Sequence, residues 1–491
     1  MSQGTRGPKG PPPTASAREI ELFRRLGDPA HMLEVLQREL GRATEEPIRV
    51  TRVKTKLRRT RAADQAGRLE VVYRVLVERR GQGEREYVLL GTAPETAEFL
   101  RVEEGRCRAL RGHPAVAPFR EVAVHVGELE LALRLFPLDP ALPALAELTG
   151  SGGAALLSPY MRECRAGATV ERVEWELRHY KPFKRAVLRI TASFSGPNAP
   201  PRPLYAKLFH DDRGSKFHAE LAALSSAARG ARSLRVPESL GYDAERRMFL
   251  MSEAAGPGHL IEWIKCLEKH RPLPAGVDLA RVERCVVVAA ESLAELQRSG
   301  IRPSRARTFR SALAALERDL DALRAKLPRN ELVRSAEELL ARLEALAPSE
   351  EELLPAHGGF RHKQTVGDEG SLTVIDWDGL CRGDSALDPA TFLARLRQEP
   401  VRDPGNAPEM ARLAETFRRE FLARRPAVSP GRLALYEAVV LTERLLRSFR
   451  RATRDGEMPR RIRNLAAAAR EMLDLAGARP VEDPPGSKAV A

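Results

Sequence analysis

The fold is decided by three neighbouring segments of the sequence: HGGFRHKQ (residues 357–364), LTVIDWDG (372–379) and GDSALDPA (383–390). The second segment opens with a strand-like run of mostly apolar residues, so it predicts a short strand with Asp376 at its end. Asp376 and Asp378 are two residues apart, and on an extended chain their carboxylates point to the same face. Such oxygen ligands suit Mg²⁺ when phosphate oxygens complete its coordination.

The sequence around these segments is mostly helical. Apolar residues recur at helical spacing in six stretches, at about 278–299, 305–326, 330–346, 408–424, 431–453 and 459–476. The three segments form a non-helical insert, at about 354–390, between the third and fourth stretches. Function is often found in such an irregular insert, because the regular elements around it hold it in place.

A region rich in strands comes before the helical region. Within residues 170–255 we expect three strands (173–180, 186–194, 204–209), a helix (215–228) and two more strands (239–242, 247–253). A mixed sheet followed by a bundle of helices predicts an α+β protein with two lobes.

Residues 48–140 follow the same order of strands and helix, after two short helices. Tyr87 and Phe99 are twelve residues apart, as are Tyr205 and Phe217, and the two pairs are 118 residues apart. Two explanations stay open: a degenerate duplication, and two unrelated sheet–helix units that share a common order.

The composition is that of a folded protein with two or three domains. The chain has 491 residues, of which 43% are hydrophobic and 30% charged. Its formal net charge is +14, and a basic balance attracts phosphates, nucleic acid and anionic lipid. Basic residues are spread among acidic ones, so an arginine-rich composition explains the charge, and an anionic partner remains the alternative. No basic motif interleaved with aromatic residues predicts binding to nucleic acid.

Cysteines and apolar stretches indicate a cytoplasmic protein with no membrane partner. The five cysteines form no CxxC pair, so the sequence predicts neither a zinc site nor a disulfide framework, and a reducing compartment fits. Residues 1–14 lack the apolar core of a signal peptide. No stretch reaches the roughly 18 apolar residues that span a bilayer. The histidines show no metal-ligand spacing, and no GxSxG setting predicts a hydrolase.

The three segments resemble the aminoglycoside-phosphotransferase family, which includes choline kinase and maltokinase-like proteins. In that family the loop reads HGDxxxxN, followed by IDW or IDF and then GDPxxDLA. The order and spacing match here, and the resemblance covers roughly residues 170–450. It implies a bilobal protein-kinase-like fold of class α+β, with a mixed sheet lobe, a helical lobe and an extra N-terminal α+β cap.

The resemblance and the composition together predict five parts of the chain. These are a tail (1–15), a cap domain that is a possible degenerate repeat of the sheet lobe (16–150), the kinase-like N-lobe (170–256), the helical C-lobe with the catalytic-type loop (257–477) and a second tail (478–491). The stretch at 136–140, FPLDP, would be the linker after the cap.

Family roles are transferred to this chain residue by residue. Asp376 matches the metal-binding acid, with Asp378 as a further metal candidate, and Gln364 stands where the family has a metal-binding Asn. Gln carries the same amide oxygen on a longer stem, so the resemblance implies weaker metal ligation. His357 matches a histidine that supports the loop.

Two acids of the third segment, Asp384 and Asp388, match residues that brace the loop in the family. The resemblance therefore implies a structural role for both.

The departure from the family lies at Gly359, where the family has the Asp that accepts the proton of the attacking hydroxyl. Gly has no side chain, so the base position is vacant. General-base assistance contributes about 10²–10⁴-fold in rate. His362 and Asp378 are the candidates to replace the base.

The sheet lobe supplies the candidate nucleotide-binding residues. Kinase lobes hold phosphates with a Lys on the third strand, paired with a Glu on the next helix. Lys207 and Glu220 match these two positions. The basic turn at 178–185 is similar to a YKPxRR stretch of maltokinase-like relatives, and Lys181 in it is a further phosphate contact.

Two functions follow from the resemblance. The first is phosphoryl transfer from ATP, with Mg²⁺, to a hydroxyl of a small polar molecule such as a sugar or an aminoglycoside-like compound, slowed by the missing base. The alternative is a catalytically inactive pseudokinase that binds nucleotide and a protein partner as a regulatory or scaffolding module. The sequence does not identify the acceptor or the oligomeric state.

Overall fold

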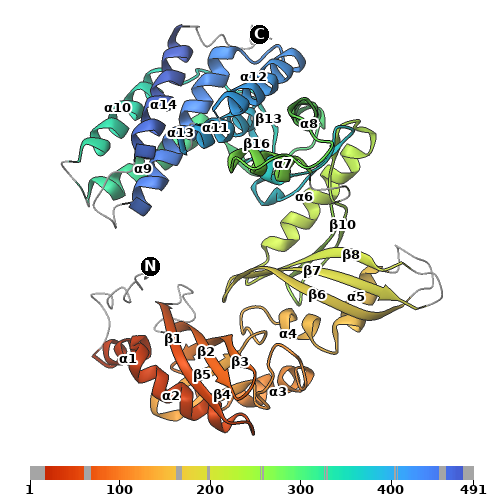
Figure 1. Ribbon diagram of the computed structural model, residues 1–491, viewed down its shortest axis with the longest axis vertical. Coiled ribbons are helices and arrows are strands. Elements are labelled where there is room, and N and C mark those ends of the chain that lie inside the picture. Colours follow the sequence, from red (N-terminus) through yellow and green to blue (C-terminus); the bar gives the residue numbers. More distant parts are fainter. Residues whose placement is uncertain are drawn as a thin grey trace, which may run out of the picture. The chain divides into compact units, whose positions relative to one another are not determined.

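The computed structural model describes most of the chain (Figure 1). The described residues are 17–59, 68–161, 169–195, 200–254, 256, 259–325, 327, 330–402, 405, 407–452 and 460–478. The predicted tail at 1–15, and all but the first residue of the tail at 478–491, lie outside them. The chain divides into two compact units: Met1–His218 with Leu240–Ser252, and Ala219–Ser239 with Glu253–Ala491.

The first unit begins with two helices and an antiparallel sheet. The helices are α1 (Ala17–Gly27) and α2 (Pro29–Arg42), and α2 starts at Asp28, whose side chain accepts a hydrogen bond from the Ala30 amide. The strands are β1 (Ile48–Arg59), β2 (Leu69–Arg79), β3 (Gly83–Ala93), β4 (Ala123–Val126) and β5 (Leu131–Leu135), and α3 (Phe99–Ala109) lies between β3 and β4. Their order is β1-β2-β3-β5-β4, and each neighbouring pair is antiparallel.

A second sheet of the same unit has the same strand order. Its strands are β6 (Val170–Lys181), β7 (Arg185–Phe194), β8 (Arg202–Phe209), β10 (Ser239–Asp243) and β11 (Met248–Ser252), arranged β6-β7-β8-β11-β10. The helix α6 (Arg213–Ala227) follows the third strand, as α3 does in the first sheet. In both sheets the third strand is central and the fifth strand lies beside it.

Each sheet has a hydrophobic core of its own. In β7 every second residue is buried, as expected for a strand with one face on a core. Two short helices, α4 (Ala144–Thr149) and α5 (Gly153–Met161), contribute Leu145 and Leu157 to the core of the second sheet. The next residue, Ala146, packs in the core of the first sheet, so α4 contributes to both cores.

The stretch between the two sheets is tightly bound. Asp139, in the predicted linker at 136–140, is only 1% exposed. Its Oδ2 accepts hydrogen bonds of 2.9 Å from the Tyr180 hydroxyl and from the Phe183 amide, and Phe136 packs on the Tyr180 ring. These residues hold the basic turn between β6 and β7.

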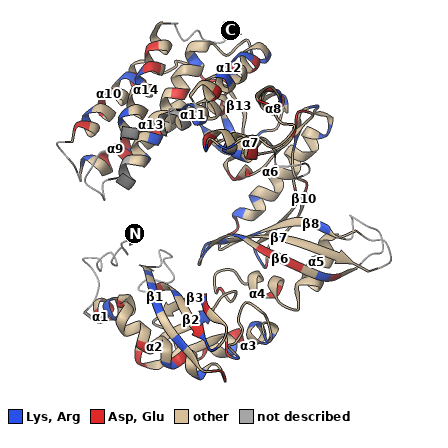
Figure 2. Ribbon diagram, in the orientation of Figure 1, with Lys and Arg blue, Asp and Glu red and all other residues tan. Residues whose placement is uncertain are grey.

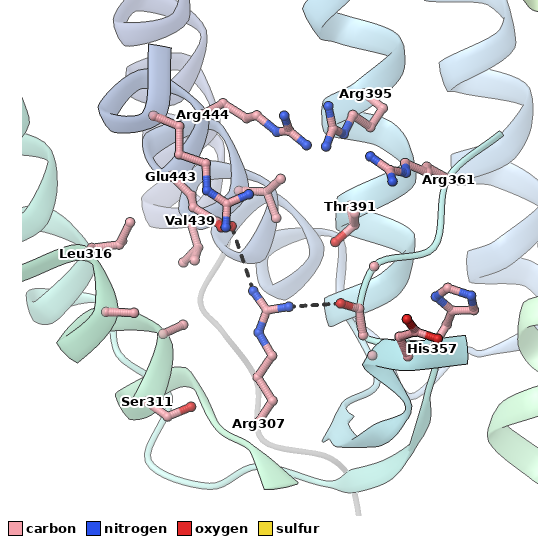
Figure 3. A pocket seen from close by; sticks show the side chains of 18 of the residues that line it. Arg307, Ser311, Leu316, His357, Arg361, Thr391, Arg395, Val439, Glu443 and Arg444 are labelled. Carbon is pink, nitrogen blue, oxygen red and sulfur yellow. Dashed lines mark hydrogen bonds and ion pairs between the residues drawn. The ribbon is translucent and has the colours of Figure 1, made fainter. Parts of the chain in front are cut away.

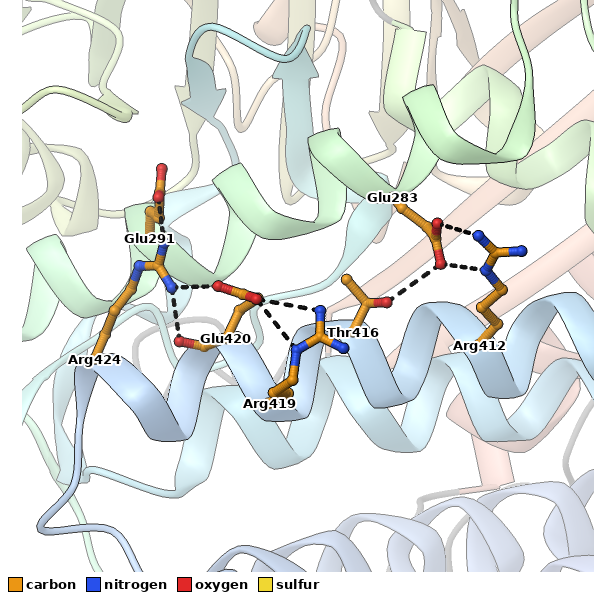
Figure 4. A network of polar contacts seen from close by, with 7 residues as sticks. All are labelled: Glu283, Glu291, Arg412, Thr416, Arg419, Glu420 and Arg424. Carbon is orange, nitrogen blue, oxygen red and sulfur yellow. Dashed lines mark hydrogen bonds and ion pairs between the residues drawn. The ribbon is translucent and has the colours of Figure 1, made fainter.

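The second unit is mainly helical. Its helices are α7 (His259–Glu268), α8 (Leu279–Arg298), α9 (Phe309–Arg324), α10 (Glu331–Ala345), α11 (Leu387–Arg402), α12 (Ala407–Arg424), α13 (Pro430–Ala452) and α14 (Arg460–Ala478). Charged side chains join α8 to α12 (Figure 4): Arg412 binds Glu283 through two hydrogen bonds of 2.6 and 2.7 Å, and Arg424 contacts Glu291.

Two three-stranded sheets lie within this helical unit. One has the order β12-β16-β13, with β12 (Ala306–Arg307), β13 (Leu353–Ala356) and β16 (Cys381–Asp384). The other has the order β14-β15-β9, with β9 (Leu234–Arg235), β14 (Thr365–Gly367) and β15 (Leu372–Val374). Together they carry the non-helical insert expected at 354–390.

Lys and Arg residues occur on elements of both units and are mixed along the ribbon with Asp and Glu residues (Figure 2). Among the described helices, none combines the length and the apolar character needed to cross a bilayer.

Candidate functional site

Strand register brings Gln364 and Asp376 together. In the β14–β15 pair Thr365 faces Val374, and the Ile375 amide donates a 2.9 Å hydrogen bond to the Gln364 carbonyl. The two side chains then meet, with Gln364 Nε2 donating to Asp376 Oδ2 at 3.1 Å. Residues twelve positions apart thus form one polar pair.

The backbone of Asp376 has an uncommon conformation. Its φ is +68°, in the left-handed region that few residues other than Gly adopt, and Asp is among those that tolerate it. The short helical turn η6 (Trp377–Gly379) follows, and the Trp377 indole fixes it by donating a 2.7 Å hydrogen bond to the Val374 carbonyl. Such conformations are often found at binding sites.

The HGG loop (residues 357–364) is locked against η6 by two glycines. Strands β13 and β16 are antiparallel, with Ala356 opposite Cys381, so the start of the loop runs beside Gly379. Gly358 has φ +73°, and a Cβ at this position would lie 2.2 Å from the Gly379 oxygen. Only glycine fits there, which keeps the loop within reach of Asp376.

Asp388 holds the same loop from the start of α11. Its carboxylate accepts hydrogen bonds from the backbone amides of His357 (2.5 Å), Gly359 (3.0 Å) and Phe360 (3.3 Å). Three amides directed at one buried carboxylate brace the loop.

Asp384 connects β16 to α13. It forms a buried ion pair with Arg432, with Arg432 Nε 3.0 Å from Asp384 Oδ2, and it also accepts from the Ala386 amide at 2.8 Å. Burial by itself lowers the pKa of Arg432, but its hydrogen bonds and charge attraction with Asp384, added to the attraction of other nearby groups, outweigh burial, so the pKa of Arg432 is raised. The pair stays charged and holds its geometry.

His357 is buried behind the loop. Its Nε2 donates to the Ile375 carbonyl at 3.0 Å, and its ring packs on Trp377, 4.6 Å between centroids. Burial lowers the pKa of His357, so the ring is neutral near pH 7. The ring therefore connects the HGG loop to the residue before Asp376.

Gly359 leaves open space at the position of the family base. A Cβ added there meets no other atom within 4 Å, and the backbone φ is not left-handed. The position would therefore accept a Cβ atom without a clash or backbone strain.

His362, one of the two candidates to replace the base, is buried beside Glu268. Its Nε2 lies 3.1 Å from Glu268 Oε1 on α7, it is 2% exposed, and burial lowers its pKa. It is not among the described residues that line the cavity beside the loop. Asp378, the other candidate, does line that cavity.

One cavity of the second unit is lined by half of the predicted site residues. Its volume is about 750 Å³, and its walls include His357, Gly359, Gln364, Asp376 and Asp378 (Figure 3).

Sequence analysis did not predict the arginines of this cavity. Among the described residues, seven arginines line it: Arg305, Arg307, Arg318, Arg361, Arg395, Arg444 and Arg447. Arg307 Nη1 donates to the Gly358 carbonyl at 3.1 Å and thereby supports the HGG loop. A signal is present in the sequence, since Arg444 and Arg447 recur at helical spacing, but that spacing does not show that their face of the helix lines a cavity.

The predicted nucleotide-binding residues belong to both units. Lys207 lies in β8, is 8% exposed, and pairs in register with Val187 and Phe249. Lys181 is exposed at the end of β6. Glu220 is in the part of α6 that belongs to the second unit, where its Oε1 accepts from Ser304 Oγ at 3.3 Å. Since Lys207 and Glu220 belong to different units, their pairing stays a prediction.

The oxygen atoms near Asp376 fit a divalent cation that is shared with phosphate. Gln364 is 6% exposed, and its Oε1 is buried without a hydrogen-bond partner. No group of three or more His, Cys, Asp or Glu side chains among the described residues is arranged to hold a metal. One or two carboxylates, completed by substrate phosphates and water, are the usual ligands of Mg²⁺.

Comparison with known proteins identifies the family. Residues 169–430, more than half of the chain, match the phosphotransferase enzyme family. The chain belongs to that family, and the α+β protein-kinase-like fold class predicted from the three segments is confirmed. None of the curated proteins compared with this chain matches it.

Several solved structures are similar to this chain. They include macrolide 2′-phosphotransferase from Brachybacterium faecium (18% identity, 64% of this chain and 97% of that one, TM-score 0.40). A choline kinase from Streptococcus pneumoniae is 14% identical, over 66% of this chain and 99% of that one, with a TM-score of 0.37. An aminoglycoside phosphotransferase from Streptomyces rimosus is 18% identical, over 59% and 97%, with a TM-score of 0.33.

Proposed function

We propose that this protein transfers a phosphoryl group from ATP, with Mg²⁺, to a small polar acceptor bound in the cavity beside Asp376. The proposal rests chiefly on the contact between Gln364 and Asp376 at the wall of that cavity. An acid and an amide oxygen at these two positions are what the family uses to hold the metal ions of the nucleotide.

Each residue has a defined part in the proposal. Asp376 and Gln364 would hold the cation, with Asp378 as a further oxygen donor, and Lys207 would neutralise charge on the nucleotide phosphates. Lys181 and Glu220 keep the supporting roles predicted from the sequence. When bound, Mg²⁺ would neutralise the charge that develops on the transferred phosphoryl group.

The vacant base position does not exclude transfer. Phosphoryl transfer passes through a loose transition state, in which positioning and charge neutralisation do most of the work. With a hydroxyl acceptor, a missing base would slow the reaction by about 10²–10⁴-fold.

The test is consumption of ATP labelled in the γ-phosphate, with Mg²⁺ and candidate acceptors present. The expected result is Mg²⁺-dependent turnover that Asp376→Asn abolishes. Asp368→Asn is the matched control, because Asp368 lies in the same insert but outside the described cavity lining. Turnover that survives Asp376→Asn would contradict the proposal.

A second candidate function is a nucleotide-binding pseudokinase with a protein partner. It is favoured by the open space at Gly359 and by the position of His362 beside Glu268. Binding of ATP with no turnover for any acceptor, neutral or charged, would select this second function.

A further inference from the structure

The tip of the basic turn between β6 and β7, residues 181–184, has a strained backbone. The Lys184 amide donates a 3.0 Å hydrogen bond to the Lys181 carbonyl, which closes a four-residue turn with Pro182 and Phe183 at its centre. The φ of Phe183 is +59°. A positive φ at this third position is typical of a type II turn, in which glycine is favoured. A bulky aromatic residue is strained there and persists only when its surroundings compensate.

The compensation comes from burial on the first sheet. Phe183 is 4% exposed and belongs to one hydrophobic cluster with Val72 of β2 and Leu90 of β3. Val72 and Leu90 are opposite each other in the register of the two strands, and we call this pair the apolar platform. The side chain at the tip of a turn in the second sheet is therefore buried on the first sheet.

Charged residues flank the apolar platform on its face of the first sheet. Because side chains alternate along a strand, Arg74 lies on the same face as Val72, and Glu86 lies on the same face as Leu90. Arg74 and Glu86 are exposed and form an ion pair of 2.6 Å. An apolar patch beside such charges usually marks a contact surface, and the side chain that covers it here is Phe183.

The other face of β3 supports a different part of the unit. Leu89, the residue before Leu90, is also buried, but it packs in the core of the first sheet with Phe99 of α3. Two adjacent leucines of one strand thus have separate partners. One stabilises the first sheet itself, and the other lies in the cluster that holds the basic turn.

The backbone of the turn is held at two further points. Asp139 accepts a hydrogen bond from the Phe183 amide, and the Lys184 carbonyl accepts one of 3.1 Å from the His210 amide at the end of β8. The side chains of Lys181 and Lys184, at the first and last positions of the turn, are exposed. Two exposed cations therefore stand on a backbone that three separate contacts fix.

A fixed turn binds an anion more tightly than a flexible one. A flexible loop loses conformational freedom when it closes on a ligand, and this loss is subtracted from the binding free energy. Lysine ammonium groups donate charge-assisted hydrogen bonds to phosphate. If contacts inside the protein already order the lysines, the phosphate does not have to order them.

We propose that Phe183 is a positioning residue: docked on the apolar platform, it holds Lys181 and Lys184 in place to bind the phosphates of ATP. This inference rests on the proposed function, in which Lys181 supports the nucleotide. It gives the first sheet a part in nucleotide binding although its third strand carries Leu89 where the second sheet carries Lys207.

The experiment measures the Kd of ATP with Mg²⁺ for the full chain by isothermal titration calorimetry. Leu90→Ala removes half of the apolar platform and should raise this Kd about 10-fold, the cost of ordering one or two side chains on binding. Leu89→Ala is the matched control, because it shortens a buried leucine of the same strand on the opposite face. It should leave the Kd of the folded protein unchanged.

Phe183→Gly separates the anchoring of the turn from its formation. Glycine is the residue that this turn favours, so the variant keeps the turn itself and removes only the anchor. It should raise the Kd of ATP about 10-fold, and Phe183→Leu, which keeps an apolar side chain, should raise it less. Phe183→Gly decides the question should Leu90→Ala fail to fold.

Hydrogen exchange without nucleotide gives a second readout, which does not depend on ATP. The amides of Phe183 and Lys184 should exchange faster in Leu90→Ala than in the wild type, because the turn is then less firmly held. In Leu89→Ala they should exchange at the wild-type rate under conditions where the protein is folded.

The two proposals fail in different ways. An unchanged Kd of ATP in Leu90→Ala and Phe183→Gly, equal changes in Leu90→Ala and Leu89→Ala, or unchanged exchange of the turn would each overturn this inference and leave the nucleotide site standing. Failure of the wild type to bind ATP with Mg²⁺ would overturn the proposed function and this inference with it.

Discussion

The two sheets of the first unit have the same strand order but different residues at the centre of the third strand. In the first sheet Leu89 lies in β3 opposite Tyr73 of β2, is 2% exposed, and packs in one hydrophobic core with Phe99 of α3. In the second sheet Lys207 lies in β8, opposite Val187 of β7. The third strand of the second sheet therefore carries a lysine, whereas the third strand of the first sheet carries a leucine of the hydrophobic core.

The comparison teaches that topology alone does not define a phosphate site. The matching strand order agrees with the predicted duplication and equally with two separate units of common order, so both explanations stay open. The two sheets differ in chemistry, because one third strand carries a buried lysine and the other a buried leucine. Four predictions separate these roles, from the largest expected effect to the smallest.

Replacing Lys207 by Met should have the largest effect. Loss of one fixed charge that stabilises a transition state typically costs about 10²–10³-fold in turnover, and we expect the same here. Turnover of labelled ATP measures it. Leu89→Met is the matched control, since a swap that conserves volume should leave turnover unchanged. Equal losses of turnover in Lys207→Met and Leu89→Met would contradict a functional difference between the two sheets.

Leu89→Ala should act on stability alone. Removing a buried leucine side chain typically lowers the free energy of unfolding by about 2–5 kcal/mol, through lost burial and the cavity left behind. Urea unfolding followed by circular dichroism measures it, and the turnover of the folded fraction should stay normal. A loss of turnover in that fraction would mean that the first sheet takes part in catalysis.

Asp139→Asn should weaken the attachment of the basic turn to the stretch between the sheets. A hydrogen bond to a charged group contributes about 1.5–3 kcal/mol, and Asp139 accepts from both Tyr180 and Phe183. We expect the free energy of unfolding to fall by about that amount. We also expect a higher KM for ATP, because Lys181 lies in the same turn. An unchanged free energy of unfolding together with an unchanged KM for ATP would show that the contact does not hold the turn.

Tyr73→Phe should have the smallest effect. The buried Tyr73 hydroxyl donates to the Leu26 carbonyl at 3.1 Å, so its removal should cost about 1 kcal/mol of unfolding free energy at pH 7. Burial raises the pKa of Tyr73 well above its usual value near 10. In alkaline solution the unfolded chain loses this proton first, so the wild type loses stability as the pH rises above about 10, and the difference from Phe narrows. A difference in unfolding free energy between the wild type and Tyr73→Phe that widens as the pH rises would contradict the hydrogen bond and burial assigned to the Tyr73 hydroxyl.

The sequence predicted local elements well, because strands and helices follow short patterns. The order of strands and helix predicted in residues 170–255 agrees with β6, β7, β8, α6, β10 and β11, although the two-residue strand β9 was not predicted. The HGG loop and Asp376, which the sequence grouped together, line one cavity. A run of apolar residues before Asp376 was enough to indicate β15, because the hydrogen bonds of a strand depend on few neighbours.

The residues that sequence analysis missed depend on packing between distant elements. Three arginines of the cavity lining, Arg361, Arg395 and Arg444, come from the HGG loop, α11 and α13, and nothing in one helix shows which of its arginines lines a cavity. The stretch that contains Asp139 is predicted to be a linker, because the prolines beside Asp139 favour an extended segment. In the structure the Asp139 carboxylate is buried by contacts with a turn more than forty residues further along the chain. Such contacts are visible only in three dimensions.

The most direct test of the central claim is a calorimetric titration of the full chain with ATP, with and without Mg²⁺. The account predicts that Mg²⁺ tightens ATP binding in the wild type and in Asp368→Asn, and that this gain disappears in Asp376→Asn. Equal affinity with and without Mg²⁺, or an undiminished gain in Asp376→Asn, would contradict it.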